Sequence, residues 1–250
     1  MLTGDSSPRY PIHNSARVAC CRPDSHWHKL RAPCQSMPFA HKTDIVFHGE
    51  NRPRSTIKAP IFEALFMQIR ELDIPGVKLL SPRRFSDDRG WFSESYNQKT
   101  LAQFDIHWQF VQDNHSYSKH AGTIRGFHFQ APPHAQDKLV RCVRGSIVDI
   151  AVDLRAGSPT YAKWVAAELS AENGEQLFVP VGFAHAFITL QPDTEVLYKV
   201  TSFYAPESDG GVRWDDPTIG FPWKLPPGAP HLSAKDAKLP RLQDIETPFR

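Results

Sequence analysis

The stretch that decides the fold runs from Ser146 to Leu154 and reads SIVDIAVDL. Apolar residues occupy every second position, at Val148, Ile150, Val152 and Leu154. Asp149 and Asp153 fall between them, on the opposite face of an extended chain. The alternation predicts a β-strand with one buried face and one polar face.

Similar short runs of β-branched and aromatic residues recur along the chain, separated by turn signals rich in Gly, Pro, Asn and Asp. They predict further strands over Trp164–Leu169, Gln176–Val179, Ala184–Leu190 and Val196–Tyr204. One segment, Asn97–Phe104, is typical of a short helix. The pattern therefore favours an all-β domain built as a double-sheet jelly roll or barrel, because closing or doubling a sheet protects its edge strands.

Composition places the chain among ordinary globular proteins, with 250 residues, 40% apolar residues and 22% charged residues. Nine of the 29 Lys and Arg residues and five of the 27 Asp and Glu residues fall in residues 1–66, which leaves 20 basic and 22 acidic residues beyond them. A balanced main domain lacks the basic stripe of a nucleic-acid-binding protein. We therefore expect a small-molecule partner and no nucleic acid.

Residues 1–66 contain seven Pro and five His and show no strand or helix periodicity before about Ala59. This composition predicts an irregular or disordered extension. We expect the jelly-roll domain to span residues 67–250, beginning at Met67. The alternative is a short helix over Ala59–Leu72.

Cysteine usage and hydropathy bear on location. Cys20, Cys21 and Cys34 cluster in the extension and Cys142 stands alone, so no disulfide framework is indicated. The adjacent pair does not match the usual CxxC zinc spacing. No apolar run approaches the ~20 residues that span a bilayer, and no secretory leader is evident. We expect a cytoplasmic protein without a membrane partner.

The most polar stretch is Phe110–Arg141, which is richer in polar side chains than a packed sheet requires. Within it, a strand over Gly126–Gln130 would place both phenylalanines on one face and His128 on the other. A lone strand histidine is more often a core residue than a functional one. Here Arg125 and Lys138 flank it, which favours a pocket.

Two later segments add candidates. Pro180–Phe187 is a turn leading into a strand that carries His185, and it resembles the second cupin motif. The first cupin motif offers two histidines and a glutamate to a metal, whereas this chain offers only His128 at that point, so a metal site is poorly supplied. In Val196–Gly210, alternation places Tyr198 and Tyr204 on one face, where both could enter one cavity.

Several of these segments together resemble the dTDP-4-dehydrorhamnose 3,5-epimerase family, over about residues 67–240. The resemblance rests on Asp88–Tyr96, Phe110–Gln130, Lys138–Arg141, Val181–His185, Leu197–Pro206 and Ser233–Asp236. Members of the family commonly begin near a sequence like the one that starts at Met67. The resemblance implies a cupin-type jelly roll and epimerisation of dTDP-4-dehydro-6-deoxy-D-glucose at C3 and C5, without metal or cofactor.

The resemblance also implies the roles of individual residues. His128 matches the general base, Asp236 the carboxylate that orients it, and Tyr198 the general acid on the opposite face. Lys138, assisted by Arg125, matches the cation that stabilises the enolate. Residues implied to bind the substrate are Arg89, Glu94, Gln112, Asn114, Arg125, His185, Tyr204, Asp209 and Lys235.

A homodimer is implied too, because strands near the N-terminal part of the family domain cross to the partner. Arg89 and Glu94 would then serve the neighbouring site, the alternative being a surface ion pair beside the turn at Asp87–Gly90. Two departures stand out. Phe127 replaces the usual leucine of the family motif, and Asp209 stands where glutamate is common, which shortens one polar contact.

Three alternatives remain at this point. One is an epimerase that acts at C3 or C5 alone. Another is a metal-dependent cupin enzyme using His128, His134 and His185. The third is a cupin that binds a sugar or nucleotide without catalysis.

Overall fold

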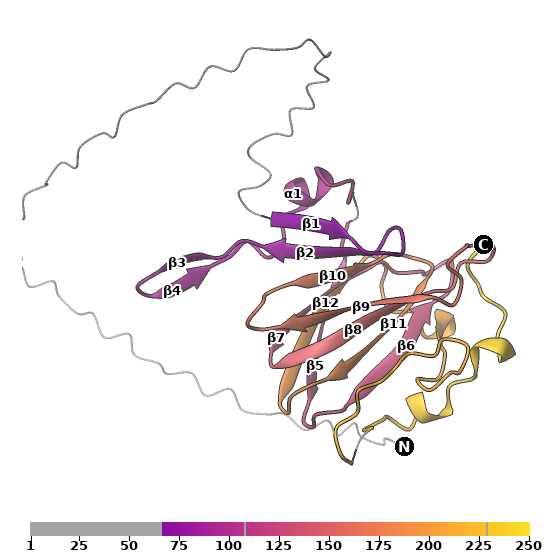
Figure 1. The fold of residues 1–250 in the computed structure, drawn as a ribbon. Coiled ribbons are helices and arrows are strands. Elements are labelled where there is room, and N and C mark those ends of the chain that lie inside the picture. The colour runs from indigo at the N-terminus through magenta and orange to yellow at the C-terminus, as the bar shows by residue number, and fades with distance from the viewer. Residues whose placement is uncertain (1–66, 108, 229) are drawn as a thin grey trace, which may run out of the picture. The chain divides into compact units, whose positions relative to one another are not determined.

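The computed structural model describes residues 67–107, 109–228 and 230–250, so the predicted extension lies outside the described residues. Two antiparallel sheets make up the body of the domain (Figure 1). The six-stranded sheet has the order β1 (Met67–Glu71), β2 (Lys78–Pro82), β10 (Gln176–Val179), β7 (Lys138–Arg144), β12 (Thr194–Val200) and β5 (Gln112–Ser118). The five-stranded sheet has the order β13 (Asp209–Gly211), β6 (Ile124–Gln130), β11 (Phe183–Thr189), β8 (Ser146–Asp153) and β9 (Trp164–Ser170). The predicted all-β, two-sheet architecture is confirmed.

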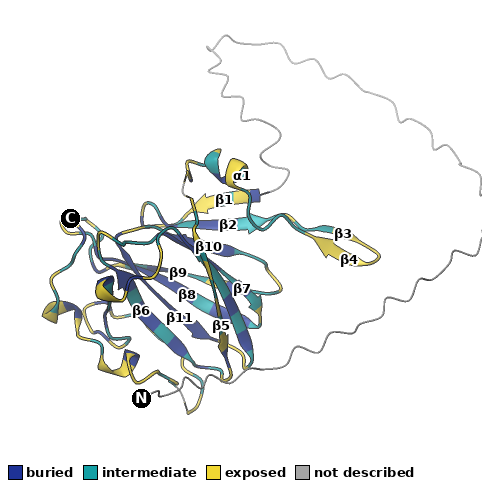
Figure 2. Ribbon diagram, turned by 180° about the vertical axis from the view of Figure 1, so that it is seen from behind, coloured by how far each residue is buried: buried dark blue, intermediate teal, exposed yellow. Residues whose placement is uncertain are grey.

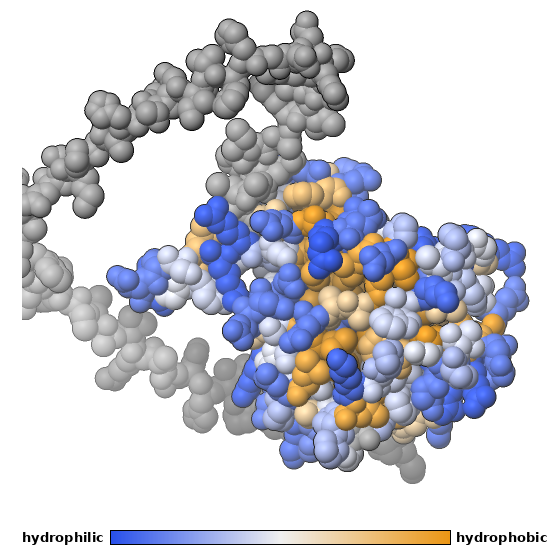
Figure 3. Space-filling model, viewed as in Figure 1, coloured by the Kyte–Doolittle hydropathy of each residue, from blue (hydrophilic) through white to orange (hydrophobic). Residues whose placement is uncertain are grey.

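The remaining elements are small. A hairpin of β3 (Phe85–Asp87) and β4 (Gly90–Phe92) projects from the body, and its tip is hydrophilic (Figures 1 and 3). The helices are α1 (Gln98–Ala102) and the 3-10 turns η2 (Pro206–Ser208), η3 (Asp236–Lys238) and η4 (Leu242–Asp244). Among the described residues, no helix is long and apolar enough to cross a membrane.

Three hydrophobic clusters hold these layers together. The first lies between the two sheets and includes Leu79, Val140, Ile147, Leu169, Phe183 and Phe187. The second covers the outer face of the five-stranded sheet with the C-terminal segment and includes Phe127, Phe129, Ile150, Val152, Leu242 and Phe249. The third covers part of the other sheet and includes Met67, Leu80, Leu101 and Phe178. Apolar burial of this extent is the main driving force for the fold.

The strand predicted over Ser146–Leu154 is β8, and both of its faces are buried, as Figure 2 shows in dark blue. Ile150 and Val152 pack under the C-terminal segment, as alternation predicts for the apolar face. The expectation of an open polar face is wrong, since Asp149 and Asp153 are fully buried. Asp153 is bonded to Arg155 at 2.8 Å, while Asp149 faces the space between the sheets.

Local capping explains the helix. Asn97 is the N-cap of α1, and its side-chain oxygen accepts a hydrogen bond from the Lys99 amide at 2.9 Å. The helix predicted over Asn97–Phe104 is therefore present but shorter. The alternative helix over Ala59–Leu72 is wrong in its described part, because Met67–Glu71 is strand β1.

The strand predicted over Val196–Tyr204 also ends early, at Val200. The buried carboxylate of Asp137 accepts a hydrogen bond from the Thr201 hydroxyl at 3.1 Å. Tyr204 consequently lies on a loop, not on the strand that carries Tyr198. The shared face predicted by alternation is wrong for Tyr204.

Gly126 fixes how closely β6 approaches β11. Its φ is +123°, a conformation that L side chains rarely adopt, and an added Cβ would lie 2.5 Å from the carbonyl oxygen of His185. Both the dihedral angle and the close approach therefore require glycine here.

We expect Gly126→Ala to lower the free energy of unfolding by about 3 kcal/mol or more, because backbone strain adds to steric overlap. Denaturant unfolding measures this. Gly157→Ala is the matched control, since Gly157 also has a positive φ, of +76°, but its added Cβ would meet nothing within 4 Å. That variant should lose about 1 kcal/mol. Equal losses in the two variants would contradict the role given to the close approach.

Candidate active site

A polar cavity opens between the two sheets and consists of two adjoining parts. The first part, about 230 Å³, is lined by Ser116, Arg125, His128, Lys138, His185, Phe187, Tyr198, Ser233, Lys235 and Asp236. The second part, about 210 Å³, is lined by Gln112, Asn114, His128, Phe129, Gln130, Gln136, Lys138, Tyr198, Tyr204, Asp209 and Lys235. The parts share four residues, namely His128, Lys138, Tyr198 and Lys235. They form one continuous site.

A bulge in β6 aims two of these side chains. On β11, His185 pairs with His128 and Phe187 pairs with Arg125, so β6 has one more residue than its partner across this interval. In a regular strand, residues three apart face opposite sides. The extra residue lets Arg125 and His128 line the same cavity, a re-aiming typical of bulges near active sites.

His128 is bonded to a buried carboxylate. Its Nε2 lies 2.7 Å from Oδ1 of Asp236, which is 3% exposed. Burial raises the pKa of Asp236, but the hydrogen bond and charge of His128, the Ser233 hydroxyl and Lys235 together bring it below its usual value. The carboxylate is therefore ionised and can hold the imidazole through either protonation state.

Lys138 places a cation beside this pair. Its Nζ donates to the backbone oxygen of His128 at 3.4 Å, and the side chain is 8% exposed. Burial lowers its pKa to about 8, while the charges of Asp149 and Asp209 oppose that shift. At neutral pH the ammonium is still the major form, in a site where its charge is poorly screened.

Tyr198 faces His128 from the other sheet. Burial raises the pKa of its hydroxyl, and the positive charge of Arg125 opposes this only in part. The phenol therefore remains protonated at neutral pH. Arg125 is itself held from β5, donating to the Ser118 hydroxyl at 3.3 Å and to the Tyr117 carbonyl at 2.9 Å.

A second pair of a histidine and an aspartate is buried more completely than the first. Nε2 of His185 is 2.7 Å from Oδ1 of Asp149, and both residues are buried. Burial raises the pKa of Asp149, against the opposing effects of His185 and Lys138. Sequence reasoning placed Asp149 on an open polar face and so missed it. A regular spacing of acids on an otherwise apolar strand was the available signal.

Polar groups of the second part are bonded to one another. Gln112 donates to Oδ1 of Asn114 at 2.8 Å and accepts from the Tyr204 amide at 3.2 Å. Asp209 accepts hydrogen bonds from both the Lys235 ammonium and the Tyr204 hydroxyl. These five predicted residues are therefore brought together, with Tyr204 reaching the site from its loop.

Two predicted residues lie elsewhere. Arg89 is on the projecting hairpin, where it pairs with Asp87 and its side chain is 89% exposed. Glu94 accepts hydrogen bonds from the side-chain amide of Asn97 and from the Thr100 hydroxyl beside α1. Neither lines the cavity of its own chain.

The arrangement does not fit the metal alternative. His128 and His185 are each bonded to a separate aspartate, and His134 lies 3.5 Å from Glu207. Within residues 67–107, 109–228 and 230–250, no three His, Cys, Asp or Glu side chains converge as a metal would require. The site instead offers a proton acceptor, a proton donor and a fixed cation.

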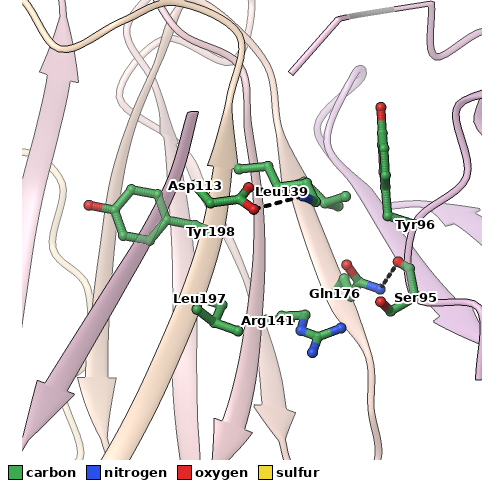
Figure 4. Close-up of a pocket in the computed structure, with 9 residues that line it drawn as sticks. Ser95, Tyr96, Asp113, Leu139, Arg141, Gln176, Leu197 and Tyr198 are labelled. Carbon is green, nitrogen blue, oxygen red and sulfur yellow. Dashed lines mark hydrogen bonds and ion pairs between the residues drawn. The ribbon is translucent and has the colours of Figure 1, made fainter. Parts of the chain in front are cut away.

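A separate pocket of about 200 Å³ lies on the other face of the six-stranded sheet (Figure 4). The Lys199 ammonium donates to the Asp113 carboxylate at 2.9 Å. The side-chain amide of Gln176 donates to the Ser95 carbonyl at 2.7 Å. Figure 4 shows the Tyr198 ring pointing away from these groups, which is consistent with its place between the sheets.

Lys138 should make stability depend on pH above neutrality. Between its folded pKa of about 8 and its ordinary value of 10.5, the unfolded chain binds a proton that the folded protein does not. Stability of the wild type relative to Lys138→Met should therefore rise by about 2.5 kcal/mol between pH 7 and pH 10. Urea unfolding across this range measures it. Parallel curves for the two proteins would show that Lys138 keeps an ordinary pKa.

Comparison with known proteins agrees with the geometry. The family model described as dTDP-4-dehydrorhamnose 3,5-epimerase matches residues 71–244. A relative of that name from Sinorhizobium fredii is 51% identical over 185 residues, which cover 74% of this chain and 94% of the relative.

Two solved structures bear the same likeness. The dTDP-4-dehydrorhamnose 3,5-epimerase of Bacillus anthracis, with TDP and PPi bound, is 50% identical and covers 70% of this chain and 99% of its own, with a TM-score of 0.68. The Legionella pneumophila dTDP-6-deoxy-D-glucose-3,5-epimerase, in complex with dTDP-4-keto-L-rhamnose, is 39% identical and covers 72% and 95%, with a TM-score of 0.69. The chain belongs to the dTDP-4-dehydrorhamnose 3,5-epimerase family.

Proposed function

We propose that this isomerase converts dTDP-4-dehydro-6-deoxy-D-glucose to dTDP-4-dehydro-L-rhamnose by inverting C3 and C5. One observation carries the proposal: His128 on the five-stranded sheet, bonded to Asp236 of η3, lines the same cavity as Tyr198 on the six-stranded sheet, with the Lys138 ammonium beside His128. Inverting a carbon next to a ketone requires proton removal from one face and proton return to the other. A base and an acid on facing sheets meet that requirement.

His128 is the base. Because its Nε2 is bonded to Asp236, the nitrogen left to accept a proton is Nδ1. That nitrogen takes the proton from the carbon beside the ketone, and the C–H electron pair forms an enolate whose charge collects on the C4 oxygen. Lys138 and Arg125 stabilise this charge, which exists only after proton removal.

Tyr198 is the acid. Its raised pKa keeps the phenol protonated, so it delivers its proton to the opposite face of the carbon. The inverted centre then carries a proton from the tyrosine, and the original proton stays on His128. Exchange with solvent restores both groups, so solvent hydrogen must enter the product.

The second part of the cavity binds the nucleotide. Tyr204 is 58% exposed at its rim and offers a ring face for the thymine base. Lys235 supplies a charge for the diphosphate, and Gln112 and Asn114 supply amide groups. Asp209 orients Lys235 and Tyr204 through its two hydrogen bonds.

The hairpin is the basis for proposing a homodimer. Trp91 and Phe92 are 58% and 68% exposed there. Exposed apolar side chains of this size are typical of a surface that a protein partner covers. Arg89 at its tip would then reach the diphosphate of the neighbouring site, and Glu94 would lie at the same interface. We place the enzyme in the cytoplasm, where the free thiol of Cys142 would remain reduced.

Solvent exchange tests the reaction. Incubation with the 4-keto-6-deoxyglucose nucleotide in deuterated water should place label at both C3 and C5, read by NMR. His128→Ala should abolish labelling while dTDP still binds. His134→Ala is the matched control and should retain it, as should a chelator-treated sample. Label at one carbon would identify a single-centre epimerase, and dependence on His134 would favour the metal alternative.

Mixing two inactive variants tests the shared site. His128→Ala and Arg89→Ala, each nearly inactive alone, should recover about a quarter of wild-type activity after subunit exchange, because each mixed dimer holds one intact site. The control mixture, His128→Ala with Tyr198→Phe, should recover none, since both residues belong to the same chain's cavity. Absence of recovery in the first mixture would place Arg89 outside the neighbouring site.

A further inference from the structure

The register of the strands orders the cavity along its length. Gln112 and Asn114 on β5 line the second part, and Ser116, two residues further on the same face, lines the first. On β6 the same order runs from Gln130 through His128 to Arg125. The catalytic groups therefore lie in the middle, and Ser116 and Arg125 lie at the end away from the proposed nucleotide site.

Ser116 is unusual at that end. Its hydroxyl oxygen is buried and has no hydrogen-bond partner among the residues that the structure describes. Ser118, next on the same face, instead accepts from Arg125. A buried hydroxyl without a partner destabilises the folded protein, since it has lost hydration without replacement. Such groups are rare in native structures, and a catalytic role is one explanation for them.

Its neighbours are the groups that surround the reacting carbon. Tyr198 pairs with Asn114 across β12 and β5, so Ser116 is the diagonal neighbour of Tyr198 on the same face. Arg125 contributes to the same end of the cavity from the facing sheet. Ser116 thus lines the same part of the cavity as the proposed acid and a fixed positive charge.

The chemistry of the substrate supplies a partner. In a hexopyranose joined to a diphosphate at C1, C4 lies across the ring from that linkage. With the nucleotide in the second part of the cavity, the C4 oxygen points toward Ser116 and Arg125. We infer that Ser116 is a catalytic residue that donates its hydroxyl hydrogen to the C4 oxygen and strengthens this bond as the enolate forms. The inference rests on the proposed function.

Ser116→Ala separates this role from a structural one, because the change removes only the hydroxyl. We expect kcat to fall about tenfold to a hundredfold, with KM and the inhibition constant of dTDP nearly unchanged, as for loss of one oxyanion donor when others remain. Deuterium entry at C3 and C5 should slow by the same factor, since both exchanges develop charge on the same oxygen. The thermal midpoint should stay equal or rise, because no bond within the folded protein is lost.

Ser146→Ala is the matched control, a buried serine on β8 outside the residues that line the cavity, and it should keep full activity. Unchanged kcat in Ser116→Ala would overturn the inference. So would a rise in KM alone, or a loss of activity that follows a fall in thermal midpoint and in dTDP affinity. Absence of exchange in the wild type would instead overturn the proposed function, so the two failures are distinguishable.

Discussion

The close approach of β6 to β11 at Gly126 is the constraint on which the site depends. The extra residue that β6 accommodates there changes which side chains face inward. Phe127 and Phe129 pack beneath the C-terminal segment, and His128 faces the cavity together with Arg125. Without the bulge, either Arg125 or His128 would face the outer layer, where an unpaired polar group is costly. The bulge thus directs the phenylalanines into the hydrophobic cluster under the C-terminal segment and directs Arg125 and His128 into the cavity.

Several charged side chains lie between the two sheets, and the surroundings of each one decide whether it is ionised. Asp236 and Asp149 are both buried beside a histidine, yet their pKa values shift in opposite directions. At Asp236 the interactions with His128, Ser233 and Lys235 together exceed the cost of burial. At Asp149 burial prevails. The acid whose pKa is lowered is the one bonded to His128, so the surroundings of that pair favour the ionised carboxylate.

Much of this could be predicted from sequence, where local patterns sufficed. Alternation located β8, β9, β10 and β11, and it separated His128 from its flanking phenylalanines. Alternation could not predict the contacts between strands or between the two sheets. The burial of Asp149 depends on the facing sheet and its pairing with His185, over 30 residues away in the chain. Likewise, the loop that carries Tyr204 follows from the early end of β12, and the bulge follows from a contact between strands. The role of Ser116 is visible only once its missing partner is known.

The charge balance of the cavity bears on the proposed role of the hairpin. A nucleotide diphosphate brings negative charge to a site whose exposed cation, Lys235, is already paired with Asp209. In the proposed mechanism Lys138 and Arg125 stabilise the enolate, and using either for the diphosphate would reduce that stabilisation. A further cation from outside the cavity would balance this charge, as proposed for Arg89. Arg89 has a fully charged, exposed guanidinium, and its present partner, Asp87, is a surface carboxylate whose attraction is weak in water. Exchanging that pair for a diphosphate would cost little, which supports the proposal that the hairpin of a second subunit supplies this charge.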